Sequence, residues 1–526
     1  MIATSAPKVE TRYITKRQFT LLALMARWPL LVILAFQMII SVTTLRNTAF
    51  QDEALYLYAG QQIFNHWLGG PPVLDPYAIY FSGYPYFYPV IAGILDKLGG
   101  VELARWFSLL CMMGVTACVY SVTQKVFSRN AAIFAAALYV SLASVLFMGR
   151  LATYDALCLL LLGIATILAY QTSLARKSWW LAVWIGPLLL MAVTAKYAAL
   201  LLALPVLGIL IVLSLEKQGW WRTLLRVAIV IVTIAILGVM AYKLMDKDVL
   251  KGLSLTTTNR VAIVQRSPLE LLIHVLQLGG IAYALGIVGL YLMFREKRSR
   301  WLALVLFGAS LLVPAYHMYK QEYVSLDKHL AFSLFYVMPL VGYTLSKVSG
   351  YTQQRFSLGR NWLAGLAIVL LVFTIGTQQA QTIYAGWADT TNLSYQLHTQ
   401  LRAGSGRYLS EDIEVARYYA EDVSDSWQWN GVNFLYYTDP HNKQFSGNDA
   451  FTRAIDDGYF DVVELSFNYQ PYQARSIAQQ MAATKNYDLV GKVKFQNSFG
   501  IGYYYLWHKA TPGKGNFTSL KQVRLP

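Results

Sequence analysis

Long apolar runs separated by short polar stretches dominate the first three quarters of the chain. A helix needs about 20 residues to cross a bilayer, and eleven runs approach or exceed that length. They cover residues 21–44, 103–123, 131–149, 152–172, 179–194, 197–215, 224–244, 271–294, 301–318, 330–347 and 361–381. The fifth and sixth runs merge, and only the stretch 194–197 divides them. The pattern predicts a polytopic α-helical membrane protein with about eleven transmembrane helices.

The pattern changes after residue 384, where short apolar segments alternate with polar ones. Period-two segments indicate strands at 407–410, 460–467, 490–495 and 503–508. Amphipathic runs through Tyr419 and over 471–483 indicate helices. We therefore expect a transmembrane domain over 1–384 and a small α/β domain over 385–526.

Composition supports a membrane location. Of 526 residues, 56% are hydrophobic and 14% are charged, whereas a soluble domain is about 25% charged. About twenty mostly polar residues precede the first run, which is unlike a cleavable signal peptide. Cys111, Cys118 and Cys158 all lie inside apolar runs, so we interpret them as small buried hydrophobes and expect no disulfide.

The net charge of +16 is distributed unevenly along the chain. Residues 1–384 hold 31 basic and 14 acidic groups, while 385–526 hold 13 basic and 14 acidic groups. Basic residues recur before the first run and in every even-numbered gap between runs, which predicts that these segments are cytoplasmic. The C-terminal domain is then extracytoplasmic, and the protein is expected in a bacterial plasma (inner) membrane. Because the basic excess belongs to the membrane half, we expect no nucleic-acid partner.

The first outer loop, about 45–102, is long and rich in polar and aromatic residues. It begins with Asp52 and Glu53 directly after the first run and continues as an aromatic amphipathic stretch, which predicts a helix in the interface plane. Tyr84, Tyr86 and Tyr88 follow in a proline-rich segment. These rings fit either an interfacial aromatic belt or a platform for a sugar.

Other ionisable residues are expected at the same membrane face. Ionisable groups near lipid are expensive to bury and mark functional sites. They are Arg150, Tyr154, Asp155, Lys196, Arg260, Arg266, His317, Lys320, Glu322, Asp327, Lys328 and His329. A cleft lined by carboxylates and cations suits group transfer from a lipid phosphate, because a carboxylate can take the acceptor's proton and cations can hold the leaving phosphate.

Several motifs resemble those of the GT-C superfamily of membrane glycosyltransferases. The nearest branch is that of the dolichyl-phosphate-mannose protein mannosyltransferases and the bacterial aminoarabinose (lipid A) transferases. The matching segments are Asp52-Glu53-Ala54, the proline-rich stretch 81–89 before 104–108, the stretch 152–156 with Tyr154-Asp155, and 194–197 with Lys196-Tyr197. The resemblance extends over about residues 20–350.

The resemblance implies an inverting transferase that uses a polyprenyl-phosphate sugar, with membrane lipids around it. Asp52 is the expected base, and Glu53 and Asp155 are the further acidic candidates. The expected contacts to the donor phosphate are Arg150, Lys196, Lys320, Lys328 and His329, and the expected substrate platform is Tyr84, Tyr86, Tyr88 and Tyr154.

The sequence departs from the family pattern at Leu55 and Gly83, so a divalent cation remains an open alternative. It names neither the sugar nor the acceptor, whose hydroxyl belongs to a lipid, a glycan or a protein, and it does not give the oligomeric state. The alternative function is a membrane transporter or lipid flippase, but no repeated halves accompany the apolar runs.

Overall fold

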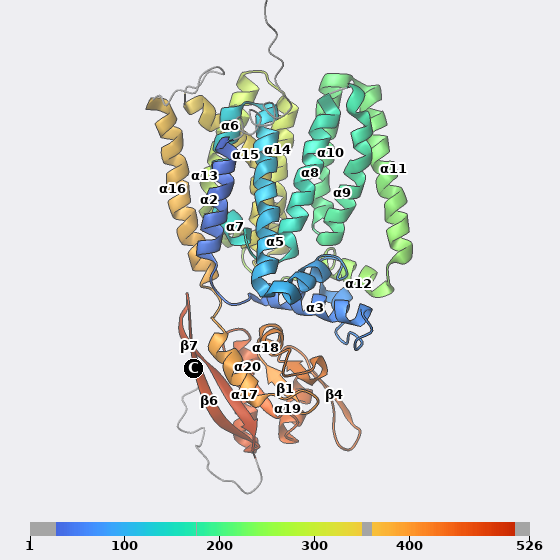
Figure 1. Ribbon diagram of the computed structural model, residues 1–526, viewed down its shortest axis with the longest axis vertical. Helices are drawn as coiled ribbons and strands as arrows, with labels where there is room; N and C mark the ends of the chain where they lie inside the picture. The colour runs from blue at the N-terminus through green and yellow to red at the C-terminus, as the bar shows by residue number, and fades with distance from the viewer. Residues whose placement is uncertain (1–27, 175, 350–359, 511–526) are drawn as a thin grey trace, which may run out of the picture.

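The computed structural model describes residues 28–174, 176–349 and 360–510. A helical bundle forms one end of the molecule and the C-terminal domain the other, with short helices lying crosswise between them (Figure 1). Within the described residues, nine helices are long and apolar enough to cross a membrane. They are α5 (Tyr88–Val126), α8 (Tyr154–Leu174), the Lys177–Ala195 stretch that contains α9 (Ala182–Ala195), α10 (Ala199–Gln218), α11 (Trp220–Leu244), α13 (Pro268–Arg295), α14 (Arg300–Lys320), α15 (Leu326–Val348) and α16 (Arg360–Tyr384). The chain is therefore an integral membrane protein.

Two of the predicted spans have another form. The first is represented by α2 (Trp28–Thr44), and the rest of that run lies outside the described residues. The run 131–149 is not one helix, because it divides into α6 (Arg129–Tyr139) and α7 (Ala143–Met148). Helix α16 packs against this break, where a Cβ on Gly376 would lie 2.0 Å from the carbonyl oxygen of Ser141. The count of eleven crossings stays a prediction.

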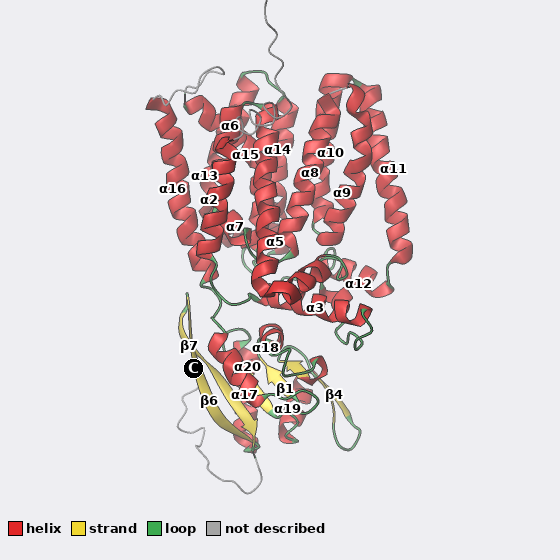
Figure 2. Ribbon diagram, viewed as in Figure 1, coloured by secondary structure: helices red, strands yellow, loops and turns green. Residues whose placement is uncertain are grey.

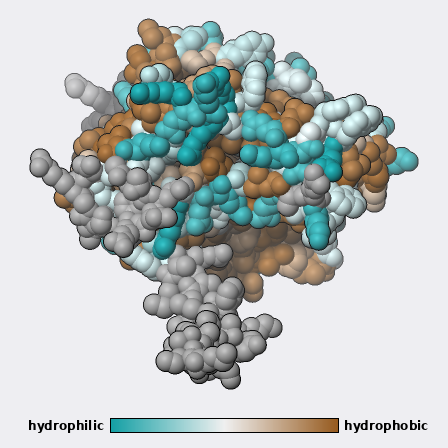
Figure 3. Space-filling view, turned by 90° about the horizontal axis from the view of Figure 1, so that it is seen from above, coloured by the Kyte–Doolittle hydropathy of each residue, from teal (hydrophilic) through white to brown (hydrophobic). Residues whose placement is uncertain are grey.

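Burial separates the centre of the bundle from its edge. Helix α15 is buried along most of its length and packs against α13, α14 and α6. Helix α11 is exposed along most of its length, and its exposed side chains are mostly apolar, as expected for a helix that faces lipid. Seen from the end opposite the C-terminal domain, hydrophilic side chains gather over the helix ends and apolar side chains flank them (Figure 3).

Short helices lie between the bundle and the C-terminal domain (Figure 2). They are α3 (Gln51–Trp67), α4 (Tyr77–Tyr80), the start of α5 and α12 (Lys247–Thr256). Helix α5 changes direction at Gly99 and Gly100, and Gly100 has a φ of 68°, which favours glycine. Its first part packs on α3 so closely that a Cβ on Gly60 would lie 1.7 Å from the carbonyl oxygen of Pro89. The helix expected in this stretch is thus present as α3, and its position in the membrane interface stays a prediction.

The C-terminal domain is a small α/β domain, as predicted. Its elements are α17 (Thr391–Gln400), β1 (Tyr408–Ser410), α18 (Ile413–Tyr419), β2 (Trp429–Gly431), β3 (Tyr436–Thr438), β4 (Gln444–Ser446), α19 (Gly447–Asp456), β5 (Val462–Leu465), α20 (Pro471–Thr484), β6 (Tyr487–Asn497) and β7 (Gly500–Lys509). The main sheet has the order β2-β1-β5-β7-β6, with β1 parallel to β2 and β5, and with β7 antiparallel to β5 and β6. Strands β3 and β4 form a separate antiparallel pair.

Helix α18 joins this domain to the first outer loop. Arg417 forms an ion pair of 2.9 Å with Asp75. The hydroxyl of Tyr418 donates to Asp96 at 2.8 Å, and the amide of Ala49 donates to the hydroxyl of Tyr419 at 2.6 Å. The domain is therefore fixed against α3 and the segments that flank it.

Candidate active site

Two carboxylates and two ammonium groups meet where α3, α8, α15 and the α9–α10 break come together. Nζ of Lys328 lies 2.5 Å from Oδ2 of Asp52 and 3.5 Å from Oδ2 of Asp155. Nζ of Lys196 lies 2.5 Å from Oδ1 of Asp155. We call Asp52, Asp155, Lys196 and Lys328 the ionic centre. All four were expected at the outer rim on different connections between spans, and the fold brings them into direct contact.

The two carboxylates of the ionic centre differ in their access to solvent. Asp155 lies in the first turn of α8, is fully buried, and also accepts a hydrogen bond of 3.0 Å from Thr153 Oγ1. Asp52 lies in the first turn of α3, and 28% of its side chain is exposed. A helix N-terminus stabilises negative charge at both positions. Asp52 is thus the carboxylate that a ligand can reach.

Lys196 is positioned by a strand-like contact with the first outer loop. The amide of Tyr84 donates to Thr194 O, and the amide of Tyr197 donates to Ser82 O, each at 2.8 Å. A Cβ on Gly83 would lie 2.3 Å from the carbonyl oxygen of Ala195, so only glycine permits this approach. The break between α9 and α10 therefore packs against the segment 82–84. Lys196 lies in this break, and its side chain reaches Asp155.

A pair of histidines extends the ionic centre. Nε2 of His329 lies 3.8 Å from Oδ1 of Asp155, and Nδ1 of His329 lies 3.0 Å from Nε2 of His317. His317 in turn contacts the backbone oxygen of Glu322 at 2.6 Å. The predicted His329 thus lies beside the buried carboxylate, with His317 as its support.

Glu53 faces away from the ionic centre although it is adjacent to Asp52 in sequence. Its carboxylate accepts hydrogen bonds from Arg105 Nε at 2.9 Å and Arg105 Nη2 at 2.7 Å. It also accepts from the amides of Ala152 at 2.8 Å and Phe50 at 2.9 Å. Glu53 and Arg105 are both essentially unexposed. Glu53 therefore ties α3 to α5 and to the turn before α8.

Arg150 also lies outside the ionic centre. Its Nη1 donates to the backbone oxygen of Leu45 at 3.0 Å, its Nη2 contacts the carboxylate of Glu102, and its guanidinium lies over the ring of Trp106. These contacts hold the end of α2 against α5. The structure does not bring Arg150 together with the other predicted phosphate contacts.

The four tyrosines expected to form a platform do not share one surface. Tyr88 is fully buried, and Tyr154 is buried beneath Lys196, whose Nζ lies 4.7 Å from the ring centroid. Tyr86 is 41% exposed and stacks on Trp67. Tyr84 contacts Tyr86 edge to face. Only the Tyr84–Tyr86 side of the set is open to a ligand.

A mostly apolar groove opens beside the ionic centre. It has a volume of about 400 Å³ and runs between α10, α14, α15 and the loop after α12. Its apolar lining includes Leu200, Leu201, Val313 and Phe332, and its polar lining includes Lys196, Arg260, His317, Lys320 and His329. We call it the apolar groove. Of these polar residues, Lys196 and His329 lie beside Asp155.

Arg260 and Lys320 reach the apolar groove from its outer side. Lys320 Nζ donates to the backbone oxygen of Thr258 at 3.1 Å, and Arg260 Nη2 lies 3.5 Å from Oε2 of the buried Glu322. The sequence placed Arg260 at the outer rim without giving it a role. Its position in an otherwise ordinary loop carries no local signal, so only the fold identifies it as a groove residue.

The donor set does not suit a divalent cation. The ammonium of Lys328 already contacts both Asp52 and Asp155, and Asp155 forms a second ion pair with Lys196. Within the described residues, no group of three or more His, Cys, Asp or Glu side chains is arranged to hold a metal ion. We therefore derive no metal-dependent step.

Comparisons with known proteins agree with the sequence motifs and with the fold. Residues 84–242 match the family described as dolichyl-phosphate-mannose-protein mannosyltransferase. No curated protein sequence matches significantly.

Solved structures resemble most of the chain. ArnT from Cupriavidus metallidurans in the apo state superposes with a TM-score of 0.62 and 13% identity, over 91% of this chain and 98% of that one. ArnT bound to undecaprenyl phosphate gives a TM-score of 0.59 with 13% identity and the same coverage, 91% and 98%. The archaeal oligosaccharyltransferase AglB from Archaeoglobus fulgidus, in complex with an inhibitory peptide and a dolichol-phosphate, gives 0.54 with 14% identity, over 91% and 74%. The resemblance to GT-C membrane glycosyltransferases is thus confirmed at the level of the fold.

Proposed function

We propose that the protein is a glycosyltransferase that moves a sugar from a polyprenyl-phosphate donor to an acceptor hydroxyl. The observation that carries the proposal is the apolar groove, because its lining residues Lys196 and His329 lie beside Asp155. The groove thereby adjoins the ionic centre, which also contains the partly exposed Asp52. The likeness to the mannosyltransferase family and to ArnT supports the same chemistry. From the charge bias of the loops, we place the reaction on the outer face of a bacterial plasma membrane.

The apolar groove suits a lipid phosphate. Leu200 and Phe332 offer apolar surface to the first isoprene units, while Arg260 and Lys320 lie where a phosphate would enter. Guanidinium and ammonium groups form charge-assisted hydrogen bonds with phosphate oxygens. They also stabilise the charge that develops on the phosphate as it leaves, which lowers the barrier to transfer.

Asp52 is the group that can act as general base. The acceptor oxygen attacks the anomeric carbon and forms the new glycosidic bond, its proton passes to the Asp52 carboxylate, and the bond from carbon to phosphate oxygen breaks. The electron pair of that bond leaves with the polyprenyl phosphate. Asp155 cannot serve as a nucleophile, because it is fully buried and held by Lys196, Lys328 and Thr153. One accessible carboxylate favours a single displacement, which inverts the anomeric configuration.

Lys328 is the residue that positions the base. It is 4% exposed, and its ammonium contacts both Asp52 and Asp155. The contact fixes the Asp52 carboxylate relative to the α8 N-terminus before a substrate binds. Such preorganisation lowers the cost of reaching the transition state.

The placement of the charges counts against a transporter. A transporter would place its binding site near the bilayer midplane, between repeated halves. Here Asp52 lies in the first turn of α3, which lies between the bundle and the C-terminal domain (Figure 1). Lys328 joins Asp52 to Asp155, and Lys196 contacts Asp155, so the whole ionic centre lies at that end of the bundle.

The test compares Asp52→Asn with the control Asp248→Asn, in which an exposed carboxylate of α12 changes instead. Each variant is expressed in a strain that lacks the protein, and cell-envelope glycans are analysed by mass spectrometry. Since a general base contributes roughly 10²- to 10⁴-fold, Asp52→Asn should lower transfer at least a hundredfold, whereas the control should keep it. Normal transfer by Asp52→Asn at matched expression would refute the base assignment. Glycans that are unchanged by loss of the protein would refute the proposed function.

A further inference from the structure

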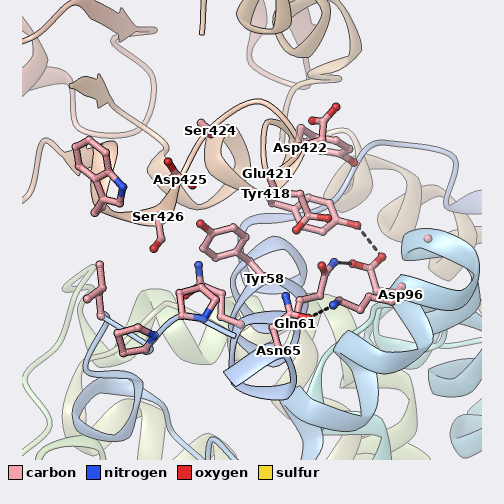
Figure 4. A pocket seen from close by; sticks show the side chains of 18 residues that line it. Tyr58, Gln61, Asn65, Asp96, Tyr418, Glu421, Asp422, Ser424, Asp425 and Ser426 are labelled. Carbon is pink, nitrogen blue, oxygen red and sulfur yellow. Dashed lines mark hydrogen bonds between the residues drawn. The ribbon is translucent and has the colours of Figure 1, made fainter. Parts of the chain in front are cut away.

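A second and larger cavity lies between α3 and the C-terminal domain (Figure 4). It has a volume of about 980 Å³ and is open to solvent on the outer side. One wall is the face of α3 with the start of α5, and the other is the segment 418–427, which includes the end of α18. We call it the outer cleft. The outer cleft and the apolar groove are separate, because they share no lining residue.

The α3 wall of the outer cleft is a stripe of hydrogen-bonding side chains. Tyr58, Gln61, Gln62 and Asn65 follow the i, i+3, i+4, i+7 spacing that places residues on one helix face. Three of the four are uncharged amides, which offer both donors and acceptors. Gln61 donates to Asp96 at 2.6 Å, so the stripe continues onto α5.

The opposite wall carries carboxylates, hydroxyls and one tryptophan. In Figure 4, Glu421, Ser424, Asp425 and Ser426 face the α3 stripe across the cavity. Trp427 is 40% exposed, and Arg407 holds it by donating to its backbone oxygen at 2.6 Å and by stacking 4.4 Å from the ring centroid. A large apolar ring is therefore fixed at the rim of an otherwise polar cavity.

The charge of the cleft narrows the class of ligand. Four carboxylates line it, those of Asp96, Glu421, Asp422 and Asp425, and the one lysine among the lining residues is Lys97. Burial, reinforced by the neighbouring charge of Asp96, raises the pKa of Glu421 to about 7. Even with Glu421 protonated, the lining carries more negative than positive charge, so an anionic ligand is disfavoured.

We propose that the outer cleft binds a neutral oligosaccharide, which is the glycan portion of the acceptor. Carboxylates and amides hydrogen-bond sugar hydroxyls, and an aromatic face packs on the apolar face of a sugar ring. The volume lies at the upper end of the usual range for small-ligand sites, about 300–1,000 Å³, so a ligand of several rings fits better than a monosaccharide. The identification of this ligand as acceptor rests on the proposed function.

The test measures binding of defined probes to the full chain in lipid nanodiscs by saturation-transfer NMR. The probes are chitotetraose and maltotetraose, which are neutral, tetragalacturonate, which is anionic, and tetralysine, which represents a cationic peptide. We expect at least one neutral tetrasaccharide to bind more tightly than tetralysine, and tetragalacturonate not to bind.

Matched variants locate the binding. Trp427→Ala removes one stacking ring and should weaken binding of the neutral probe roughly tenfold. Tyr436→Ala removes an exposed ring elsewhere in the domain and should leave this binding unchanged. Unchanged binding in Trp427→Ala, binding of tetralysine alone, or no binding of either neutral probe would overturn the inference.

Asp52→Asn separates this inference from the proposed function. It should abolish transfer and leave tetrasaccharide binding intact. Binding without any transferase activity in the wild-type chain would contradict the proposed function alone, whereas transferase activity without binding of a neutral probe would contradict the inference alone.

Discussion

The substitution Glu53→Gln separates structure from chemistry within the Asp52–Glu53 pair. The Glu53 carboxylate accepts four hydrogen bonds, two from Arg105 and one each from the amides of Ala152 and Phe50. A glutamine amide has one acceptor oxygen, and its NH₂ group would face donors. At least one buried donor would lose its partner, and Arg105 would lose its buried counter-charge.

The magnitude follows from the burial of this pair. Breaking a buried ion pair on one side costs about 3–5 kcal/mol. Glu102 remains 3.1 Å from Arg105, so we expect the lower end, about 3 kcal/mol. Asp52→Asn is the comparison: Asp52 is 28% exposed, so its pair with Lys328 contributes about 1 kcal/mol or less after solvent screening.

The assay measures thermal denaturation in detergent together with transfer per correctly folded molecule. Glu53→Gln should denature at a clearly lower temperature and keep its specific activity, whereas Asp52→Asn should denature near the wild-type temperature and lose its activity. A Glu53→Gln protein that is as stable as wild type but inactive would refute the reasoning and place Glu53 in the reaction.

Three further substitutions test other parts of the structure. Lys320→Gln removes a cation from the apolar groove and should raise the KM for the donor about tenfold with little change in kcat, since a charge-assisted contact is worth about 1.5–3 kcal/mol; a normal donor KM would exclude Lys320 from phosphate binding. Burial, and then the charge of Glu411, raise the pKa of Glu464 to about 8. The protonated side chain therefore stabilises the folded domain at low pH, and this stabilisation is lost as the pH rises from about 4.5 through 8. Glu464→Gln should therefore flatten the fall in denaturation temperature between pH 5 and pH 8, and an unchanged slope would contradict the assignment. Gly60→Ala would place a Cβ 1.7 Å from the Pro89 oxygen and should destabilise the protein by about 1–3 kcal/mol or more, which protease sensitivity of the first outer loop would reveal; wild-type resistance would show that α3 can move away from α5.

The sequence predicts most of the helices because lipid requires long apolar segments of nearly uniform length. The break between α6 and α7 escapes prediction, since residues 131–149 form a continuous apolar run with Gly149 as the only glycine and no proline. The close packing of α16 at Gly376 accompanies that break, and packing partners are not encoded locally.

The candidate active site likewise has residues that the sequence reveals and contacts that it does not. Asp155 and Lys196 interrupt apolar runs at the outer rim, so their exceptional position is visible in the sequence. The different surroundings of Asp52 and Glu53 are not visible, because adjacent helical residues point about 100° apart and the partner of Glu53 is Arg105, far along the chain. Lys328 was expected among several basic residues of one loop, and only the fold distinguishes its direct contact with Asp52 from the outer position of Lys320.

The separation of the two cavities has an evolutionary consequence. The apolar groove is built from α10, α14, α15 and the loop after α12, whereas the outer cleft is built from α3, α5 and the C-terminal domain. A substitution in one set of elements leaves the lining of the other unchanged. Descendants of such a chain can therefore change the lining of one cavity while they retain the lining of the other. A different C-terminal domain would have to replace the contacts that Arg417 and Tyr418 make with Asp75 and Asp96.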